Sequence, residues 1–331
     1  MILAVDGGNS KTDVALVSSE GRLLAAVRGP TTSHQQVGLA VGIDRLAGLV
    51  AEVRAAAGLL PADSAAKVGV YGLAGADTAA DTRRLTSAIA ARGLADQTVV
   101  LNDGFPPIRV ASDRGWGVAV ICGSGVNAAG IDPNGRTARL AALGPISGDW
   151  GGGIDIGTAG LGAAVRARDG RGPGTALETL VPAHFGLARP IDVTRRLEAG
   201  TLGERRLGEL SPIVFRAAAT GDTVARSIVD RQADELIAMA GAIIRRLHLT
   251  RLDPDVALAG GIFAADDEAF ERRIRDGIRR VAAAATVRRS SSPPVLGAAL
   301  LGLDRLLLPG DLAGHAAAVE RASSTLGAWR A

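Results

Sequence analysis

Two kinds of apolar pattern alternate along the chain. Short continuous apolar runs, such as Ile2 to Val5 and Val14 to Val17, are separated by glycine turns and predict buried strands. Longer stretches with apolar residues at helical spacing predict amphipathic helices, the longest covering residues 223–247 with Asp222 as its N-cap. The chain begins with three strands that form an antiparallel meander, followed by helix, strand, helix and strand. This alternation predicts an α/β protein.

The same pattern starts again near residue 117. Residues 117–121, 128–131 and 137–140 predict a second set of three strands joined by turns. Each half of the chain therefore opens with a meander whose first turn is polar and rich in glycine. Two similar halves imply two related domains that face each other across a cleft.

The first turn suits a polyphosphate. Asp6 ends the first strand, and Gly7 and Gly8 let backbone N–H groups approach an anion without a Cβ in the way. Further donors follow at Asn9, Ser10, Lys11 and Thr12. A carboxylate repels bare phosphate but suits a hydrated Mg²⁺, so this turn predicts a site for a Mg-nucleotide. The alternative is an ordinary hairpin turn, and the spacing is not that of a P-loop.

Three later segments are candidates for the same site. Gly123, Ser124, Gly125 and Asn127 occupy the equivalent turn of the second half, where they would clamp the phosphates from the other side, or else simply close a hairpin. Gly260 and Gly261 follow the strand at 256–259, and a Gly-Gly turn fits the flat ring of an adenosine. A glycine-rich loop between residues 144 and 170 contains Gly148 and Asp149.

Composition excludes several functional classes. The 331 residues are 47% hydrophobic and 21% charged, and the formal net charge is only +3. Basic residues are scattered without interleaved aromatics, which argues against nucleic-acid binding. No apolar run reaches the length of a membrane helix and no signal segment is recognisable at Met1, so we expect a cytoplasmic protein without membrane contact. Cys122 is the only cysteine, which excludes an internal disulfide or a cysteine zinc site, and the histidines lack ligand spacing.

The ordered set of motifs resembles one known family. The set comprises Asp6-Gly7-Gly8 with Lys11-Thr12, Asn102-Asp103, Gly123-Ser124-Gly125 with Asn127, Gly148-Asp149, Gly260-Gly261, and Val295 to Ala299. In this order it resembles the BadF/BadG/BcrA/BcrD ATPase family of the actin-like ATPase superfamily, and within it the N-acetylglucosamine kinases. Residues 148–173 and Gly29 to Gly38 are its most specific parts. The resemblance extends from Ile2 to about Leu307.

The resemblance implies a fold and a domain plan. The fold would be two ribonuclease H-like domains around a nucleotide and sugar cleft. Residues 1–113 and about 293–308 would form the N-terminal domain, because the closing helix of this superfamily returns there. Residues 114–292 would form a C-terminal domain with helical insertions, and residues 309–331 a tail.

The resemblance also implies roles for individual residues. Residues 6–12 and 121–127 would be the phosphate loops, with Asp6 holding Mg²⁺ through water, and residues 258–263, including Gly260, Gly261 and Phe263, would contact adenosine. Asp103 would be the catalytic base. The positions that would hold the sugar are Ser33, His34, Asp103, Ser124, Asn127 and Asp149.

The chemistry of these residue types supports part of this assignment independently. A hydroxyl nucleophile needs a carboxylate to take its proton, and Asp103 is expected to follow a central strand. Its alternative role is a helix N-cap. Asp149 and Asn127 suit sugar hydroxyls, but they equally suit stabilisation of a turn, and His34 could be a packed surface residue. The sequence departs from its relatives at Trp150, at Gly152, at residues 105–107 and at Val126, all near the expected sugar.

These observations predict an ATP- and Mg²⁺-dependent kinase whose partner is a small-molecule amino sugar, N-acetylglucosamine phosphorylated at its 6-hydroxyl being favoured. Glucosamine, N-acetylmuramic acid and other hexose derivatives are alternative substrates. An ATPase that activates radical dehydratases needs cysteines for a bridging cluster, and Cys122 alone argues against it. A catalytically silent sensor is disfavoured by Asp6 and Asp103. A homodimer is left open.

Overall fold

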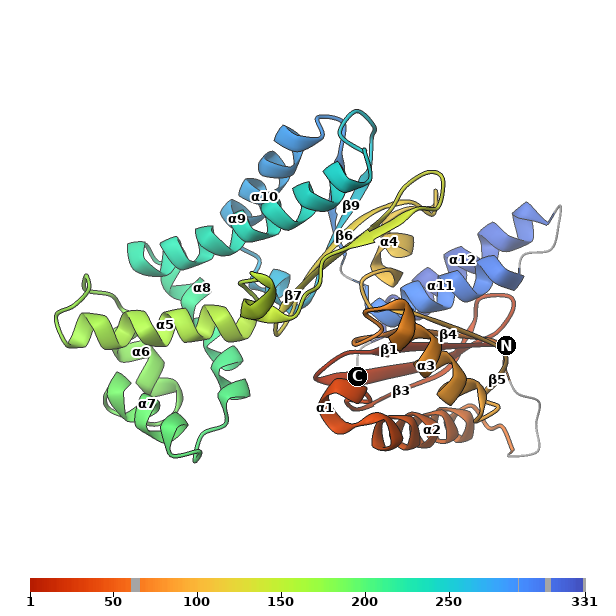
Figure 1. Ribbon diagram of the computed structural model, residues 1–331, viewed down its shortest axis with the longest axis horizontal. Helices are drawn as coiled ribbons and strands as arrows, with labels where there is room; N and C mark the ends of the chain where they lie inside the picture. The colour runs from red at the N-terminus through yellow and green to blue at the C-terminus, as the bar shows by residue number, and fades with distance from the viewer. Residues whose placement is uncertain (61–65, 291, 307–310, 330–331) are drawn as a thin grey trace. The chain divides into compact units, whose positions relative to one another are not determined.

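The computed structural model describes residues 1–60, 66–290, 292–306 and 311–329 (Figure 1). The chain divides into two compact units. Unit 1 comprises Met1–Trp116 together with Ser290–Ala331, and unit 2 comprises Gly117–Arg289. These limits lie close to the expected boundaries at residues 113 and 292, and the segment expected as a tail is grouped with unit 1.

Unit 1 contains a five-stranded mixed sheet in the order β3-β2-β1-β4-β5. The meander β1, β2 and β3 is antiparallel, as predicted, whereas β4 and β5 run parallel to β1. The strands are β1 (Ile2–Gly7), β2 (Lys11–Val17), β3 (Leu23–Pro30), β4 (Ala66–Leu73) and β5 (Ala95–Asn102). Because β1, β4 and β5 are parallel, their carboxyl ends lie at the same end of the sheet, and Asp6 and Asp103 are both found there.

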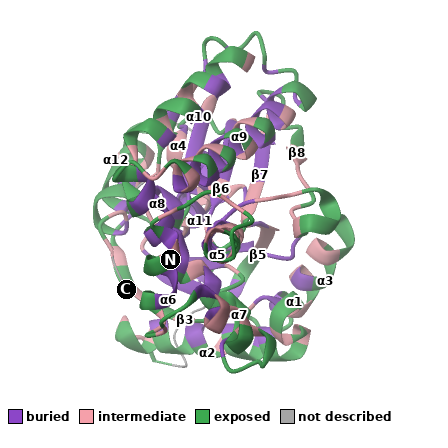
Figure 2. Ribbon diagram, turned by 90° about the vertical axis from the view of Figure 1, so that its left-hand side faces the viewer, coloured by how far each residue is buried: buried purple, intermediate pink, exposed green. Residues whose placement is uncertain are grey.

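Helices cover both faces of this sheet, as Figure 1 shows. Leu3 and Val5 of β1 face a core formed with α2 (Leu39–Ala56) and α3 (Ala79–Ala90). Ile2 and Ala4 point the other way, toward α11 (Pro294–Leu306) and α12 (Leu312–Thr325). Successive residues of a strand alternate between faces, so a wholly apolar strand is what a sheet covered on both sides requires. Strand β1 is accordingly buried along its whole length, whereas β3 and β5 at the two edges of the sheet contain half-buried and exposed residues; Figure 2 colours each residue by its burial.

Two short helices in unit 1 lie next to the expected site. Helix α1 (His34–Val37) begins directly after Ser33, and α4 (Pro106–Ala111) begins just after Asp103. Pro106 and Pro107 occupy the first turn of α4, where a missing N–H is tolerated. Arg109 of α4 is 6% exposed and bonds both carboxylate oxygens of Asp304 on α11, at 2.8 and 3.1 Å. This pair ties α4 to the helix that returns from the C-terminal part of the chain.

Unit 2 repeats the sheet plan of unit 1, with strand order β10-β9-β6-β7-β8. Strands β6, β7 and β8 form an antiparallel meander, and β9 and β10 run parallel to β6. The strands are β6 (Gly117–Cys122), β7 (Val126–Ile131), β8 (Thr137–Arg139), β9 (Asp255–Ala259) and β10 (Thr286–Arg289). The repeated meander predicted from the sequence is confirmed.

The helices of unit 2 follow the predicted pattern, with some differences. Asp222 caps α9 by accepting a hydrogen bond from the Ala225 N–H at 2.8 Å, as predicted. Residues 204–219 form two consecutive elements, η2 and α8, and α6 and strand β10 had no clear sequence signal. The elements are α5 (Gly153–Arg168), α6 (Leu177–His184), α7 (Pro190–Glu198), α8 (Ser211–Ala219), α9 (Thr223–Arg246), α10 (Glu268–Val281) and the 3-10 turns η1 (Gly144–Ser147), η2 (Glu204–Leu210) and η3 (Gly261–Ala265).

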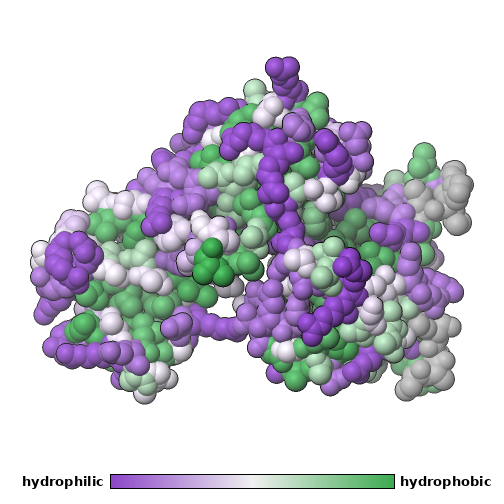
Figure 3. Space-filling view, viewed as in Figure 1, coloured by the Kyte–Doolittle hydropathy of each residue, from purple (hydrophilic) through white to green (hydrophobic). Residues whose placement is uncertain are grey.

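Helices α9 and α10 pack closely and present arginines outward. A Cβ added at Gly277 of α10 would lie 2.3 Å from the Ile237 side chain of α9, so a glycine is needed at this contact. Exposed arginines on α10 include Arg272, Arg273, Arg279 and Arg280. Figure 3 shows hydrophilic residues gathered over these helices on the face drawn.

Among the described residues, no helix combines the length and the apolar character needed to span a membrane.

Candidate functional site

The turn between β1 and β2 is held by backbone and hydroxyl groups from two other segments. The Gly8 N–H donates to the Lys11 carbonyl at 3.0 Å, which closes the turn. The Thr31 hydroxyl donates to the Gly8 carbonyl at 2.8 Å, and the Ala74 N–H donates to the Gly7 carbonyl at 2.8 Å. The expected phosphate loop is therefore fixed to the segment that follows β3 and to the end of β4.

Asp6 lies at the base of this turn and is only 8% exposed. Its pKa is raised to about 7, first by burial, then by the charge of Asp103 and then by that of Asp13. The repulsion from Asp103 means that the two carboxyl groups lie near each other. A carboxylate in such surroundings favours a nearby cation, which would relieve both the burial cost and the repulsion.

Asp13 is a charged residue whose importance the sequence did not reveal. It is fully buried beside Asp6 on the neighbouring strand, and Arg28 bonds both of its oxygens at 2.6 and 2.9 Å. The Lys11 ammonium also bonds Asp13, at 3.0 Å. Lys11, expected as a phosphate donor, is thus already paired with a carboxylate on its own strand.

Ser33 and His34 carry buried polar atoms without a partner in the structure. Ser33 is 3% exposed, and its backbone N–H donates to the Thr31 hydroxyl at 3.1 Å. Its own hydroxyl and the Nδ1 atom of His34 are buried and make no hydrogen bond. Buried polar atoms in folded proteins are nearly always satisfied, so a buried atom without a partner beside an expected binding site is a candidate contact for a ligand. A ligand with hydroxyl groups would supply such a partner.

Asp103 follows β5, and its surroundings differ from those expected. Strand β5 is at the edge of the sheet and not in its centre, which corrects the expectation from the sequence. The Asp103 N–H donates to the Leu73 carbonyl at 3.3 Å, so the residue is fixed to the end of β4. The N-cap of α4 is Phe105, without a side-chain cap bond, so Asp103 does not take the N-cap role considered as its alternative. Asp103 is half-buried.

In unit 2 the second expected phosphate loop and the glycine-rich loop before α5 are one structure. The Gly153 N–H donates to the Gly123 carbonyl at 2.8 Å, and the Ile154 N–H donates to the Ser124 carbonyl at 3.2 Å. Gly152 has a φ of +86° and lies so close to Gly125 that an added Cβ would be 2.5 Å from its Cα. Only glycine fits this backbone conformation and this contact without strain.

Gln232, which no sequence motif indicated, holds this loop through a hydrogen bond. Its side chain is fully buried, and its Oε1 accepts a hydrogen bond from the Gly152 N–H at 2.7 Å. The neighbouring Arg231 places its guanidinium 3.9 Å from the centre of the Trp150 ring, a cation–π contact. Both residues belong to α9, where Gln232 is a buried polar residue between Ile228 and Leu236 of the apolar face and Arg231 is exposed. A polar residue inside an apolar stripe was the available signal for Gln232.

Besides Ser124, the residues of unit 2 expected to bind the sugar are Asn127 and Asp149. Asn127 is on β7, opposite Ile121 of β6, and is half-buried. Asp149 follows η1, where its carboxylate contacts the Ser147 hydroxyl and its N–H donates to the Gly144 carbonyl at 3.2 Å. Asp149 therefore stabilises its own turn, which is the alternative role considered for it.

The Gly260–Phe263 segment differs in part from its expected role. Gly260 has a φ of +111°, and an added Cβ would be 2.2 Å from the Cys122 carbonyl oxygen, so the ends of β9 and β6 touch here. Gly261 is exposed, and a Cβ built there has open space around it. The Phe263 side chain is 2% exposed and its ring lies 5.8 Å from that of Phe270. Phe263 was expected to contact the cofactor, but its ring belongs to the core, which leaves the backbone at Gly261 as the accessible part.

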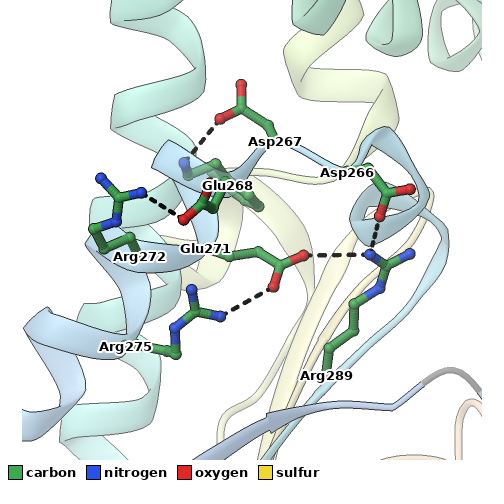
Figure 4. Close-up of polar contacts among 8 residues, drawn as sticks. Asp266, Asp267, Glu268, Glu271, Arg272, Arg275 and Arg289 are labelled. Carbon is green, nitrogen blue, oxygen red and sulfur yellow. Dashed lines mark hydrogen bonds and ion pairs between the residues drawn. The ribbon is translucent and has the colours of Figure 1, made fainter.

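Charged residues fix the turn that follows Gly261, as Figure 4 shows. Arg289 at the end of β10 bonds Asp266 at the end of η3, and it also contacts Glu271 of α10 at 3.4 Å. Arg275 bonds Glu271 from one turn further along α10, at 3.2 Å. Asp267 caps α10 by accepting from the Phe270 N–H at 2.9 Å. The η3 turn is thus tied to both β10 and α10.

Among residues 1–60, 66–290, 292–306 and 311–329, no group of three or more His, Cys, Asp or Glu side chains is arranged to hold a metal ion. Asp6 nevertheless fits a Mg²⁺ that arrives bound to a nucleotide, since Mg²⁺ usually keeps several waters and takes one or two carboxylates. Its burial and its raised pKa are the observations that favour a cation there.

The architecture defines the class of protein. Two units, each built on a five-stranded mixed sheet of the same plan, form the two-domain fold of actin-like ATPases and sugar kinases, which confirms the expected fold class. The chain belongs to the BadF/BadG/BcrA/BcrD ATPase family, which it matches over residues 3–302.

Individual relatives are similar over most of the chain. It is 25% identical to an N-acetyl-D-glucosamine kinase of Dictyostelium discoideum over 316 residues, covering 92% of this chain and 98% of the relative. It is 27% identical to an N-acetylmuramic acid/N-acetylglucosamine kinase of Clostridium acetobutylicum over 271 residues, covering 79% and 85%. A crystal structure of a candidate N-acetylglucosamine kinase from Chromobacterium violaceum aligns with a TM-score of 0.70 at 22% identity, covering 91% and 98%.

Proposed function

We propose that this protein is a sugar kinase that transfers the γ-phosphoryl group of ATP to an amino sugar, with the 6-hydroxyl of N-acetylglucosamine as the favoured acceptor. Membership of an ATPase family supports the nucleotide, and the two relatives named as kinases of N-acetylated sugars support the acceptor. The substrate of this chain is inferred from those relatives and from the chemistry of the site.

One arrangement supports the chemistry most directly. Asp103, at the end of β5, lies near Asp6 and in the same unit as Ser33 and His34, whose buried side-chain atoms lack partners. In the proposed reaction the Asp103 carboxylate accepts the proton of the sugar hydroxyl. The oxygen of that hydroxyl forms a bond to the γ-phosphorus as the bond to the leaving ADP oxygen breaks. Ser33 and His34 would hold other polar groups of the sugar.

The residues proposed to hold the nucleotide follow the two loops. In unit 1 these are the backbone of Gly7 and Gly8 with the side chains of Asn9 and Ser10. Thr12, expected as a further donor, is left out because its side chain is fully buried and bonded to Thr32. In unit 2 they are Gly123, Ser124 and Gly125, with the exposed backbone at Gly261 for the adenosine. Asp6 would hold the Mg²⁺ of the nucleotide through water, and that ion would neutralise charge on the phosphates. The joint action of the two loops on one nucleotide stays a prediction.

Two alternatives are retained as outcomes of the experiment. One is a kinase for N-acetylmuramic acid, glucosamine or another hexose derivative, which the Clostridium relative supports in part. The other is an ATPase or a sensor without sugar-dependent turnover. An ATPase that activates radical dehydratases is disfavoured, because Cys122 is fully buried and burial raises the pKa of its thiol to about 12.

The test is an assay of ADP release with ATP, Mg²⁺ and a panel containing N-acetylglucosamine, glucosamine, N-acetylmuramic acid and glucose. We expect turnover that depends on N-acetylglucosamine. Asp103→Asn should lower that turnover by roughly 10² to 10⁴-fold while the protein stays folded. ADP release that no sugar stimulates, or a full rate in Asp103→Asn, would contradict the proposal.

A further inference from the structure

The stretch of residues 73–78, which comprises the end of β4 and the loop before α3, touches three segments of the proposed site in unit 1. Its Ala74 N–H bonds the Gly7 carbonyl of the first turn at 2.8 Å. Gly75 lies against the ring of His34, since an added Cβ would be 2.7 Å from the ring carbon Cε1. At the end of β4, the Leu73 carbonyl accepts from the Asp103 N–H at 3.3 Å. No function was assigned to this loop from the sequence.

Asp77 is the side chain that joins two of these segments. Its Oδ2 accepts a hydrogen bond from the Gln35 side-chain amide at 2.9 Å, and its Oδ1 accepts one from the Asn102 side-chain amide at 2.9 Å. Gln35 is the neighbour of His34 in α1, and Asn102 is the neighbour of Asp103. One carboxylate therefore connects the segment that contains Ser33 and His34 to the residue that precedes the proposed base.

Both ends of this connection are anchored. Asp77 directly precedes Thr78, the N-cap of α3, and Thr78 and Asp81 form a capping box in which each side chain accepts from the other's backbone N–H, at 3.1 and 2.9 Å. Asn102 is 3% exposed, and its Oδ1 accepts from the Gly104 N–H at 3.0 Å. The Asn102 side chain thus makes two bonds at once. Its Oδ1 holds the turn that contains Asp103, and its amide N–H holds the Asp77 carboxylate.

We propose that Asp77 is a positioning residue that sets the distance and orientation between the sugar-binding segment at Ser33 and His34 and the base Asp103. This inference rests on the proposed kinase function. Asp77 acts through Gln35 and Asn102, without contact to the reacting atoms. Hydrogen bonds to a carboxylate are stronger than those between neutral groups, and a small displacement of a reacting group is costly in rate.

Steady-state kinetics of Asp77→Ala test the proposal. We expect kcat/KM for N-acetylglucosamine to fall by about 10- to 100-fold, with KM for the sugar raised and kcat lowered, because the sugar and the base lose their fixed relation. KM for ATP should stay within about twofold of the wild type, because the Asp77 carboxylate bonds Gln35 and Asn102, neither of which belongs to a proposed phosphate loop. Asp77→Asn retains one acceptor oxygen and should recover part of the loss. Gln35→Ala removes only the bond to α1 and should raise KM for the sugar while changing kcat little.

A matched control comes from the other end of β5. Asp96 pairs with Lys67 at 3.0 Å, and its side chain is 54% exposed. Asp96→Ala also removes one aspartate from unit 1 and should leave all kinetic constants unchanged. A merely structural role for Asp77 would instead lower the folded fraction, which reduces kcat per total protein and leaves both KM values unchanged. That result, or Asp77→Ala kinetics within twofold of the wild type, would overturn the proposal.

Hydrogen exchange separates failure of this inference from failure of the kinase assignment. Asp77→Ala should speed amide exchange in residues 34–38 and 103–108 but not in β2, whether or not any sugar is turned over. If the wild-type protein shows no sugar-dependent turnover but Asp77→Ala shows this exchange pattern, the kinase assignment fails and the positioning role of Asp77 is supported. If exchange is unchanged in both segments but the wild type turns over sugar, the positioning role fails and the kinase assignment is supported.

Discussion

Units 1 and 2 share a strand plan but place different residues at the ends of corresponding strands. In unit 1, Asp6 is the second-to-last residue of β1, and β5 is followed by Asp103. In unit 2, β6 ends with Cys122, and β10 ends with Arg289. The same framework therefore supplies carboxylates in one unit and, in the other, an apolar strand end and a cation paired with Asp266 and Glu271.

The loops of the two units are also braced in different ways. The first turn of unit 1 is held by hydroxyl and backbone bonds from Thr31 and Ala74, beside a cluster of charged residues. The corresponding loop of unit 2 is held by contact between Gly152 and Gly125 and by the amide of Gln232. We infer that unit 1 provides proton transfer and unit 2 provides a shaped backbone surface. Three substitutions test this contrast between the two units.

Asp6→Asn should have the largest effect, because it removes a charge that the fold buries at a cost. The pKa of Asp6 is raised from 3.8 to about 7, so the folded state binds the proton more tightly than the unfolded state. The stability that Asp6 contributes is fully present below pH 3.8 and is lost as the pH rises to about 7. At pH 8 the free energy of unfolding of Asp6→Asn should therefore exceed that of the wild type by up to about 4 kcal/mol. At pH 3 the variant should show no gain.

The same variant should lose activity, by roughly 10²-fold or more, if Asp6 holds the nucleotide's Mg²⁺. Denaturant unfolding at several pH values and the ADP-release assay measure the two effects. Asp44→Asn is the control, since the Asp44 side chain is 64% exposed and pairs with Arg92 on the surface. A stability gain that does not depend on pH, or an asparagine variant as active as the wild type, would contradict the role given to Asp6.

Gly152→Ala should have the next largest effect, and it should be confined to unit 2. The new Cβ would lie 2.5 to 2.7 Å from three backbone atoms of Gly125, at a φ of +86°. Strain of this kind costs about 3 kcal/mol, and the loop at Gly123 to Gly125 should be displaced. Hydrogen exchange should rise in β6, β7 and the start of α5, with unit 1 unchanged. Nucleotide affinity, measured by titration calorimetry, should fall.

The control for this substitution lies in the helix that begins at the next residue. Gly162 is an exposed residue of α5 with open space around its Cβ position. Gly162→Ala should stabilise the protein by up to about 1 kcal/mol, because alanine is the better helix former. A similar loss in both variants would show that α5 rejects any added methyl group, and the contact between Gly152 and Gly125 would then have no special role.

The two units also show what the sequence predicts and what it does not. Apolar runs and glycine turns predicted both meanders, because burial and turn conformation are local properties of a segment. Strand β10 was missed since only Val287 among its residues is buried, and the edge position of β5 depends on pairing that no local pattern encodes. Asp77 and Gln232 were missed for a related reason: their partners Asn102 and Gly152 are 25 and 80 residues away.

Tyr71→Phe should have the smallest effect and tests whether every buried polar atom has a role. The Tyr71 hydroxyl is fully buried in the core between the sheet and α2, and it makes no hydrogen bond, whereas buried Gln232 in unit 2 bonds the Gly152 N–H. Burial of an unpaired hydroxyl is unfavourable, so its removal should leave the free energy of unfolding unchanged or raise it by about 1 kcal/mol. Gln232→Leu, which deprives Gly152 of its acceptor, should instead cost about 1 to 3 kcal/mol. If Tyr71→Phe were as destabilising as Gln232→Leu in denaturant unfolding, the hydroxyl would have a partner such as a buried water, and the contrast between the two side chains would disappear.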